Sequence, residues 1–171
     1  MNPPREAAFS LGSNLGDSPA LLGEARRLLR ATPGVREAAA SSLYETSPVD
    51  VPPEFSAVRF LNAVLILEGP FDAAGWHRIA HEVEDRLGRV RDGRRNVPRT
   101  IDVDLLYCGD ETVSTSALQV PHPRWHTRRF VLAPLAEVRP DAQPPGSDRT
   151  VLQTLRALDD KEDVRKTPLI W

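Results

Sequence analysis

The sequence predicts an α+β fold in one domain that covers residues 1–171, and three observations support this prediction. Short apolar runs typical of strands recur along the chain, two longer segments carry apolar residues at helical spacing, and glycine and proline separate these segments. A chain of 171 residues can also bury a substantial core. No repeat, low-complexity tract or interdomain linker divides it.

The first half of the chain predicts three strands and a helix. The first strand covers residues 7–11, and the helix follows over 18–31, with leucines on one face and Pro33-Gly34 at its end. Residues 35–44 are expected to form the second strand, although alanines weaken its pattern. The strongly apolar run 60–67 is expected to form the third.

The second half adds a helix over 71–87, with Ile79, Val83 and Leu87 inward, and a strand over 101–107. The resulting order is βαββαβ. This is the ferredoxin-like split pattern, in which both helices cover one face of an antiparallel sheet. A short strand and two helices are expected after it, at about 112–113, 129–138 and 150–158.

Composition and charge exclude several classes of protein. The net charge of −2 argues against general nucleic-acid binding, because the chain has no global basic field. Cys108 is the lone cysteine, so no intramolecular disulfide can form and a reducing compartment is expected. No apolar stretch reaches membrane-spanning length, and the N-terminus lacks a signal-peptide pattern. We therefore expect a cytoplasmic protein without a membrane partner.

Two carboxylates, Asp102 and Asp104, lie two residues apart in the last predicted strand of the sheet. Side chains at this spacing share one face of a strand, roughly 6.6 Å apart along it, while Ile101, Val103 and Leu105 take the other face. Such a pair repels unless a cation lies between its members. Oxygen ligands of this kind suit Mg²⁺, which completes its shell with water and substrate phosphates. The alternative is an edge strand with a polar outer face.

The stretch from Gly88 to Arg99 holds five arginines within eleven residues. Gly93 and Pro98 interrupt any regular element there, so the stretch is predicted to be a loop. Arginine forks bind phosphate oxygens in bidentate fashion, and phosphoryl transfer depends on positioning and on neutralising negative charge. A cationic loop that leads into two carboxylates therefore favours phosphate chemistry. A solvated basic loop and a nucleic-acid contact are the alternatives.

Several other polar residues are candidates for binding. Asn62 lies inside the most apolar strand, where its amide would either hydrogen-bond neighbouring backbone or read the edge of a flat heterocycle. Phe130 offers a stacking face. His122 lies between prolines and precedes three arginines, which suggests a second phosphate clamp, with a surface loop as the alternative. Gly12 to Gly16 lacks the P-loop pattern, so we expect a tight structural turn there.

Six short motifs occur in order along the chain: Leu11-Gly12-Ser13-Asn14-Leu15-Gly16, Tyr44-Glu45-Thr46-Ser47-Pro48, Phe60-Leu61-Asn62-Ala63, Gly88-Arg89-Val90-Arg91, Pro98-Arg99-Thr100-Ile101-Asp102-Val103-Asp104 and Val120-Pro121-His122-Pro123. In this combination they closely resemble the 6-hydroxymethyl-7,8-dihydropterin pyrophosphokinase family of folate biosynthesis. The resemblance covers roughly residues 7–158. Each motif is weak alone, but the combination is highly specific.

The resemblance implies transfer of the β,γ-diphosphoryl group of ATP to the hydroxymethyl oxygen of the pterin, with release of AMP. It implies that Asp102 and Asp104 hold two Mg²⁺ ions, and that Arg89 and Arg99 grip the triphosphate as catalytic residues. The further ATP contacts that it implies are His81, Glu84, Arg91, Leu105, Leu118, His122 and Arg128, with the two leucines bracketing adenine. The implied pterin contacts are Thr46, Ser47, Val49, Phe60, Asn62 and Phe130.

The chain departs from the family pattern at two places. Asn96-Val97 stand where members often carry Trp-Gly, and Pro123 replaces an aromatic residue that is common after the histidine. The loop from Arg89 to Arg99 has few apolar residues and many like charges, so we expect it to be a mobile lid that orders fully only with MgATP and the pterin.

The function that we expect is that of a Mg²⁺-dependent pterin pyrophosphokinase, a monomer with ATP and the pterin as its small-molecule partners. Two other classes are alternatives. An RRM-like RNA-binding module shares the βαββαβ order, but the aromatic RNP pattern is missing. A non-catalytic metal-binding domain of the same fold would bind metal without turning over ATP.

Overall fold

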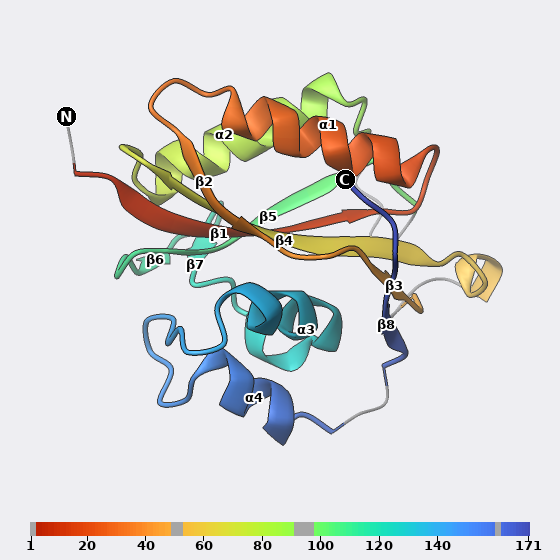
Figure 1. Cartoon of the computed structure of the whole chain (residues 1–171). Coiled ribbons are helices and arrows are strands. Elements are labelled where there is room, and N and C mark those ends of the chain that lie inside the picture. The colour runs from red at the N-terminus through yellow and green to blue at the C-terminus, as the bar shows by residue number, and fades with distance from the viewer. Residues whose placement is uncertain (1–2, 49–52, 91–97, 160–161) are drawn as a thin grey trace.

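The computed structural model describes residues 3–48, 53–90, 98–159 and 162–171. The expectations for Val49, for Arg91 and for most of the predicted lid lie outside these residues. Within them, an antiparallel sheet has the strand order β5-β1-β4-β3-β8, and β2 also pairs with β4 (Figure 1). These strands are β1 (Arg5–Ser13), β2 (Arg36–Ala40), β3 (Tyr44–Thr46), β4 (Phe60–Gly69), β5 (Asp102–Cys108) and β8 (Val164–Lys166).

Helices cover both faces of this sheet (Figure 1). The helices α1 (Ser18–Arg30) and α2 (Ala73–Arg86) lie on one face, and α3 (Arg129–Val138) and α4 (Val151–Ala157) lie on the other. Alternation along the central strand builds the two cores, because Leu65 packs toward α1 and α2 while Val64 packs toward α3. The prediction that the first two helices share one face is confirmed.

Local side chains begin three of the helices. Asp17 accepts the Ala20 N–H at the start of α1, and Asp72 accepts the Gly75 N–H at the start of α2. Thr150 begins α4 with a capping box. In contrast, the residue before α3, Arg128, makes no side-chain capping bond.

The predicted strand 35–44 is wrong as one element, because it is divided into β2 and β3. Between the pairs Ala40/Leu65 and Tyr44/Asn62 lie three residues on one chain segment and two on β4. This extra residue is a bulge that interrupts the ladder. Ser41 bridges the break, because its hydroxyl accepts the Val64 N–H at 2.9 Å.

Two further strands were not expected from the sequence. The short β7 (Gln119–Val120) pairs with β6 (Val113–Ser114) in a small separate sheet. At the other end of the chain, β8 adds an edge to the main sheet beside β3. Both strands are short, so pairing with another strand decides their conformation rather than local propensity.

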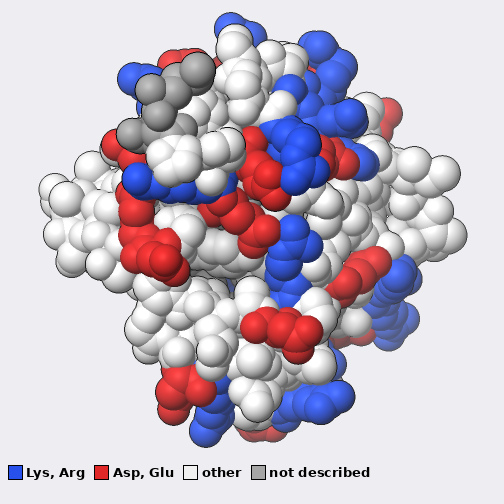
Figure 2. Space-filling view, turned by 60° about the vertical axis from the view of Figure 1, so that its left-hand side comes forward, with Lys and Arg blue, Asp and Glu red and all other residues white. Residues whose placement is uncertain are grey.

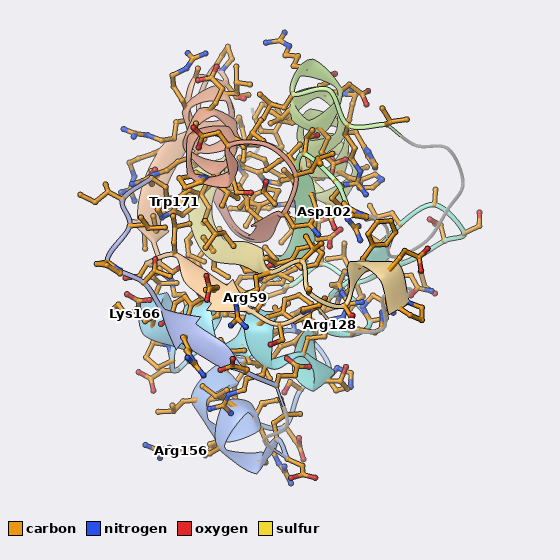
Figure 3. All side chains as sticks on the ribbon, turned by 90° about the vertical axis from the view of Figure 1, so that its right-hand side faces the viewer. Arg59, Asp102, Arg128, Arg156, Lys166 and Trp171 are labelled. Carbon is orange, nitrogen blue, oxygen red and sulfur yellow. The ribbon has the colours of Figure 1, made fainter. Side chains whose placement is uncertain are left out.

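The end of the chain folds back onto the first helix (Figure 3). The indole N–H of Trp171 donates to the Ser41 carbonyl at 2.8 Å, and the Arg26 guanidinium lies 5.0 Å from the centre of a Trp171 ring. Trp171 packs against the core under α1 and α2. Residues 162–171 are therefore part of the fold.

The surface carries mixed charge. On the face drawn in Figure 2, basic and acidic side chains are interspersed rather than gathered into one basic patch. Ion pairs such as Arg36–Glu68 and Arg139–Glu6 distribute charge in this way. No helix within the described parts of the chain has the length and apolar character needed to span a membrane.

Candidate active site

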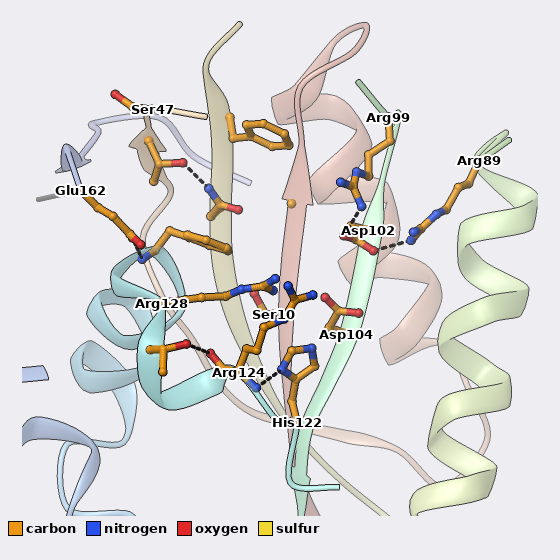
Figure 4. A pocket seen from close by; sticks show the side chains of 16 residues that line it. Ser10, Ser47, Arg89, Arg99, Asp102, Asp104, His122, Arg124, Arg128 and Glu162 are labelled. Atoms are coloured by element: carbon orange, nitrogen blue, oxygen red, sulfur yellow. Dashed lines mark hydrogen bonds and ion pairs between the residues drawn. The ribbon is translucent and has the colours of Figure 1, made fainter. Parts of the chain in front are cut away.

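A cavity of about 360 Å³ opens on the α3 face of the sheet, where β1, β4 and β5 extend beyond the helix (Figure 4). Eleven of the residues singled out from the sequence line it: Thr46, Ser47, Phe60, Asn62, Arg89, Arg99, Asp102, Asp104, His122, Arg128 and Phe130. These residues come from five separate segments of the chain. The fold therefore brings together side chains that are up to 84 residues apart in the sequence, from Thr46 to Phe130.

The acid pair reaches the cavity because of the pleat of β5. Val103 and Leu105 are buried in the core beneath α1 and α2, as predicted, so Asp102 and Asp104 face the opposite side. Burial, followed by the negative charges of Asp102 and Glu84, raises the pKa of Asp104 to about 7. A nearby cation would offset this repulsion and keep the carboxylates ionised.

Two arginines hold Asp102 from one side. The Arg99 guanidinium donates to Asp102 Oδ2 at 2.9 Å, and Arg89 donates to Asp102 Oδ1 (Figure 4). Arg89 also donates to Glu84, whose side chain is only 2% exposed. Glu84 in turn accepts the Val103 N–H at 2.7 Å. This chain of contacts links α2, the start of the arginine-rich loop and β5.

The turn after β1 holds the far end of that loop. Asn14 Oδ1 accepts the Arg99 N–H at 2.9 Å, and the Asn14 N–H donates to the Arg99 carbonyl at 3.3 Å. This pair of bonds fixes the backbone from which the Arg99 side chain reaches Asp102. The turn over Gly12 to Gly16 was predicted to be structural, and the two hydrogen bonds between Asn14 and the Arg99 backbone agree with that prediction.

A second group of basic side chains lies on the other side of the acid pair (Figure 4). His122 Nδ1 accepts the Arg124 N–H at 3.2 Å, which leaves the ring proton of neutral His122 on Nε2. Burial, together with the charges of Arg128 and Arg124, lowers the pKa of His122 to about 4. The imidazole is therefore neutral at pH 7, while both arginines keep their charge.

The remaining wall of the cavity contains the amide of Asn62, with the Thr46 hydroxyl and the rings of Phe60 and Phe130 around it. Asn62 is 4% exposed and its Nδ2 donates to Thr46 Oγ1 at 2.7 Å. A Cβ at Gly12 would lie only 2.9 Å from Asn62 Oδ1, so glycine is required where β1 passes the amide. Phe60 and Phe130 also line the cavity, and the Arg128 guanidinium lies 5.4 Å from the Phe130 ring centre.

Four predicted ATP contacts lie outside the cavity lining as the structure describes it. Leu105 is 4% exposed within the core, and Leu118 packs against the same core. Glu84 lies behind Arg89, and His81 Nδ1 is 3.2 Å from Glu84 Oε2. The adenine contact of Leu105 is implied by the resemblance and stays a prediction; the alternation that exposes Asp102 and Asp104 places the Leu105 side chain in the core.

Five lining residues were not among the predicted contacts, and one of them, Arg124, was expected only as one of the arginines after His122. Ser10 and Gly12 lie on the same face of β1 as the apolar Ala8, because alternate residues of a strand share a face. The change from an apolar to small or polar residues along this face could have predicted that they line a site. Thr127 and Glu162 had no local signal. Glu162 lies beyond the end of the family resemblance and reaches the cavity only through the path of the C-terminal segment.

The chemistry of this cavity is that of phosphate and cation binding. Within the described residues, no three His, Cys, Asp or Glu side chains gather closely enough to hold a metal alone. Two carboxylates suffice for Mg²⁺, which takes its other ligands from water and phosphate. Fold and cavity thus define a site of the phosphoryl-transfer class, in which cationic groups surround an acid pair.

Comparison with known proteins identifies the family. The family model described as 7,8-dihydro-6-hydroxymethylpterin-pyrophosphokinase (HPPK) matches residues 8–140. The chain belongs to this family. It is therefore an enzyme of the pyrophosphokinase class in folate biosynthesis.

Curated relatives carry the name 2-amino-4-hydroxy-6-hydroxymethyldihydropteridine pyrophosphokinase. The Bacillus subtilis protein is 39% identical over 132 residues, which is 77% of each chain. The Methylorubrum extorquens protein is 40% identical over 154 residues, which is 90% of this chain and 93% of the relative. Among solved structures, Plasmodium falciparum HPPK-DHPS with pteroate aligns with a TM-score of 0.71 at 14% identity, over 91% of this chain and 42% of that one. This last likeness concerns the fold alone.

Proposed function

We propose that the protein catalyses the Mg²⁺-dependent transfer of the β,γ-diphosphoryl group of ATP to the hydroxymethyl oxygen of 6-hydroxymethyl-7,8-dihydropterin. A bond forms between that oxygen and the β-phosphorus, the bond from the β-phosphorus to the oxygen of the α-phosphate breaks, and AMP and the hydroxyl proton leave. The observation that carries this proposal is the single cavity in which an acid pair, two pairs of arginines and an amide between aromatic groups adjoin.

Asp102 and Asp104 would hold the Mg²⁺ ions, and two ions are proposed. Bound Mg²⁺ would neutralise phosphate oxygens and fix their orientation. The raised pKa of Asp104 supports this assignment, because burial and the charges of Asp102 and Glu84 outweigh the opposing charges of Arg89 and Arg128, so the pair could accommodate further positive charge.

The arginines would bind the phosphates from both sides of the acid pair. Arg89 and Arg99 lie on one side, and Arg124 and Arg128 lie on the other (Figure 4). Their forks match phosphate oxygens, and those of Arg89 and Arg99 are already oriented through Asp102. Neutral His122 would add a hydrogen bond from its Nε2–H rather than a charge.

The amide side of the cavity would bind the pterin. Asn62 would read the donor and acceptor groups of the ring edge, and Thr46 holds its amide in place. Phe60 and Phe130 would pack against the flat ring, and Ser47 lines the same part of the cavity. The pterin contact of Val49 is proposed from the family resemblance alone. This assignment places the hydroxymethyl group toward Asp102 and Asp104.

Several finer features belong to the same proposal. The strand order β5-β1-β4-β3, with α1 and α2 on one face, supports a ferredoxin-like topology. The adenine contacts of Leu105 and Leu118, the ATP contacts of His81, Glu84 and Arg91, the monomeric state, the cytoplasmic location and the absence of nucleic-acid partners are also proposed. The net charge of −2 supports the last of these.

One assay tests the function directly. AMP release from ATP should require the hydroxymethyl pterin and Mg²⁺ together, and omission of the pterin or addition of EDTA should abolish it. Pterin-independent ATP hydrolysis, or no AMP release at all, would contradict the proposal. Salt-sensitive retention of RNA without AMP release would favour the RNA-binding alternative instead.

A further inference from the structure

The start of α3 lies at the pterin side of the cavity and takes its cap from a distant residue. Glu162 Oε2 accepts the Phe130 N–H at 3.2 Å from 32 residues along the chain. The first turn of a helix has N–H groups without helical partners and a positive partial charge, so a carboxylate there is favourable. The other helices that begin with a capping bond use side chains of their own segment.

The residues around this cap are cavity residues. Phe130, Arg128 and Thr127 all line the cavity, and Glu162 lines it as well. Burial and Arg124 lower the pKa of Arg128, and the charge of Glu162 is among those that oppose this effect. Glu162 thus acts on both the backbone that carries the Phe130 ring and the guanidinium beside that ring.

The segment that holds Glu162 also contacts the opposite wall. The Ser47 N–H donates to the Asp163 carbonyl at 3.1 Å, and Val164 pairs with Thr46 in the sheet. Arg59 further fixes this segment, because its Nη2 lies 3.1 Å from Asp163 Oδ2. Consecutive residues of the C-terminal segment therefore bind the Thr46–Ser47 wall and the Phe130 wall.

We propose that Glu162 is a positioning residue for the pterin half of the site, where it fixes the Phe130 wall relative to the Thr46–Ser47 wall. This inference rests on the proposed function, because it assigns the pterin to that half. Glu162 makes no described contact with Arg89 or Arg99, and it acts on Arg128 through its charge, without a hydrogen bond or ion pair that the structure describes. Its loss should therefore weaken pterin binding far more than nucleotide binding.

A matched glutamate provides the control. Glu137 lies in the last turns of the same helix and accepts hydrogen bonds from Ser42, Tyr44 and Lys166, so it also tethers α3 to the β3–β8 edge. It does not line the cavity. A purely structural effect of untethering α3 should appear in Glu137→Ala as well as in Glu162→Ala.

The experiment measures binding to the intact protein by calorimetry, together with thermal unfolding. The ligands are a non-hydrolysable MgATP analogue alone, and 6-hydroxymethyl-7,8-dihydropterin in the presence of that analogue. Glu162→Ala should weaken pterin binding about five- to twentyfold, because the capping bond is lost, while the Kd of the analogue stays within about twofold. Glu137→Ala should lower the unfolding temperature and leave the pterin Kd within about twofold.

Two more variants separate reach from charge and remain informative if Glu162→Ala does not fold. Glu162→Gln keeps an oxygen that can accept the Phe130 N–H, so it should retain most of the pterin affinity. Glu162→Asp keeps the charge but is one methylene shorter, so it should behave like the alanine variant. If folded Glu162→Ala or Glu162→Asp binds the pterin with wild-type affinity, the positioning role of Glu162 is wrong, while the proposed function stands. No pterin binding by the wild-type protein would overturn the proposed function and this inference with it.

Discussion

The two faces of the sheet are built from the same strands but have different character. The face beneath α1 and α2 is apolar over the middle of β1, β4 and β5, as at Phe9, Leu65 and Leu105. The opposite face is apolar only where α3 covers it, at Ala8, Val64 and Leu106. Beyond the helix, the same alternate positions become polar and line the cavity, at Ser10, Gly12, Asn62, Asp102 and Asp104.

This difference shows how a short helix leaves room for a site. Every second residue of a strand reaches each face, so one face can be devoted to packing while the other changes from core to site along its length. Stability and chemistry should then separate by face. Substitutions at the polar end should affect turnover, and substitutions beneath α1 and α2 should affect unfolding.

The largest effect on turnover is expected from the acid pair. Asp102→Ala or Asp104→Ala should lower kcat at least about 10³-fold, because the site would lose a proposed ligand for the ions that neutralise the transferred groups. Thermal unfolding should show an intact fold, since both carboxylates line the cavity rather than the apolar cores. Asp110→Ala, at an exposed position after β5, is the matched control. A kcat near the wild-type value in MgATP would remove the acid pair from the mechanism.

The largest effect on stability is expected from the apolar face. Leu65 is fully buried beneath α1 and α2, so Leu65→Ala should lower the free energy of unfolding by about 2–5 kcal/mol. Urea denaturation measures this loss. The kcat of the folded fraction should remain within about twofold of wild type. A loss of turnover in fully folded Leu65→Ala would show that the two faces are coupled.

Much of the fold was predictable because it depends on the spacing of apolar residues along each segment and on the glycine and proline residues that separate the segments. The helix expected at 129–138 matches α3, and the apolar run 60–67 lies inside β4. The bulge that divides β2 from β3 depends on how those strands pair with β4, and sequence periodicity does not report pairing. The edge strand β8 is short and charged, and pairing with β3 alone defines it.

The site followed a similar rule. Asp102, Asp104 and Asn62 were predictable because polar residues interrupt apolar strands, and the motifs around them are specific to the family. Glu162 was not predictable, since only the path of the C-terminal segment brings it to the start of α3. The adenine contact of Leu105 rests on the resemblance alone and stays a prediction, since the side chain packs in the core of the sheet.

The phosphate side of the cavity tests whether geometry or charge matters. Arg89→Lys and Arg99→Lys keep the positive charge but lose the fork that reaches Asp102 and that is proposed to bind phosphate oxygens. Each variant should lower kcat/KM for ATP about ten- to hundredfold in steady-state assays. Arg78→Lys, on the exposed face of α2, should have no such effect. Full activity in both cavity variants would mean that these arginines supply only general positive charge.

The amide side should show a selective effect on the pterin. Asn62→Ala removes the group proposed to read the ring edge, and an unmet partner costs about 1–3 kcal/mol of binding. Calorimetry should show weaker pterin binding and an unchanged Kd for the MgATP analogue. Because Asn62 is buried and bonded to Thr46, unfolding must be measured alongside. Unchanged pterin binding by the folded variant would refute the role.

The smallest effect is expected where the α3 face is held by polar contacts rather than by apolar packing. Burial acts to raise the pKa of Glu137, but hydrogen bonds from Lys166, Tyr44 and Ser42 outweigh it and hold the pKa below its ordinary value of 4.5. A lowered pKa means that the ionised carboxylate stabilises the folded state above that value and that this stability is lost as the pH falls.

Glu137→Gln should therefore lower the free energy of unfolding by about 1 kcal/mol at pH 7, as expected for a weakened hydrogen-bonded ion pair at a site that is 26% exposed. Urea denaturation across pH should show the two proteins converging as the pH falls from 4.5 through the lowered pKa of Glu137, because both side chains are neutral once that carboxylate is protonated. The pterin Kd should not change over this series at pH 7. A gap in stability that stays constant down to pH 3 would mean that shape, not charge, makes this contact stabilising.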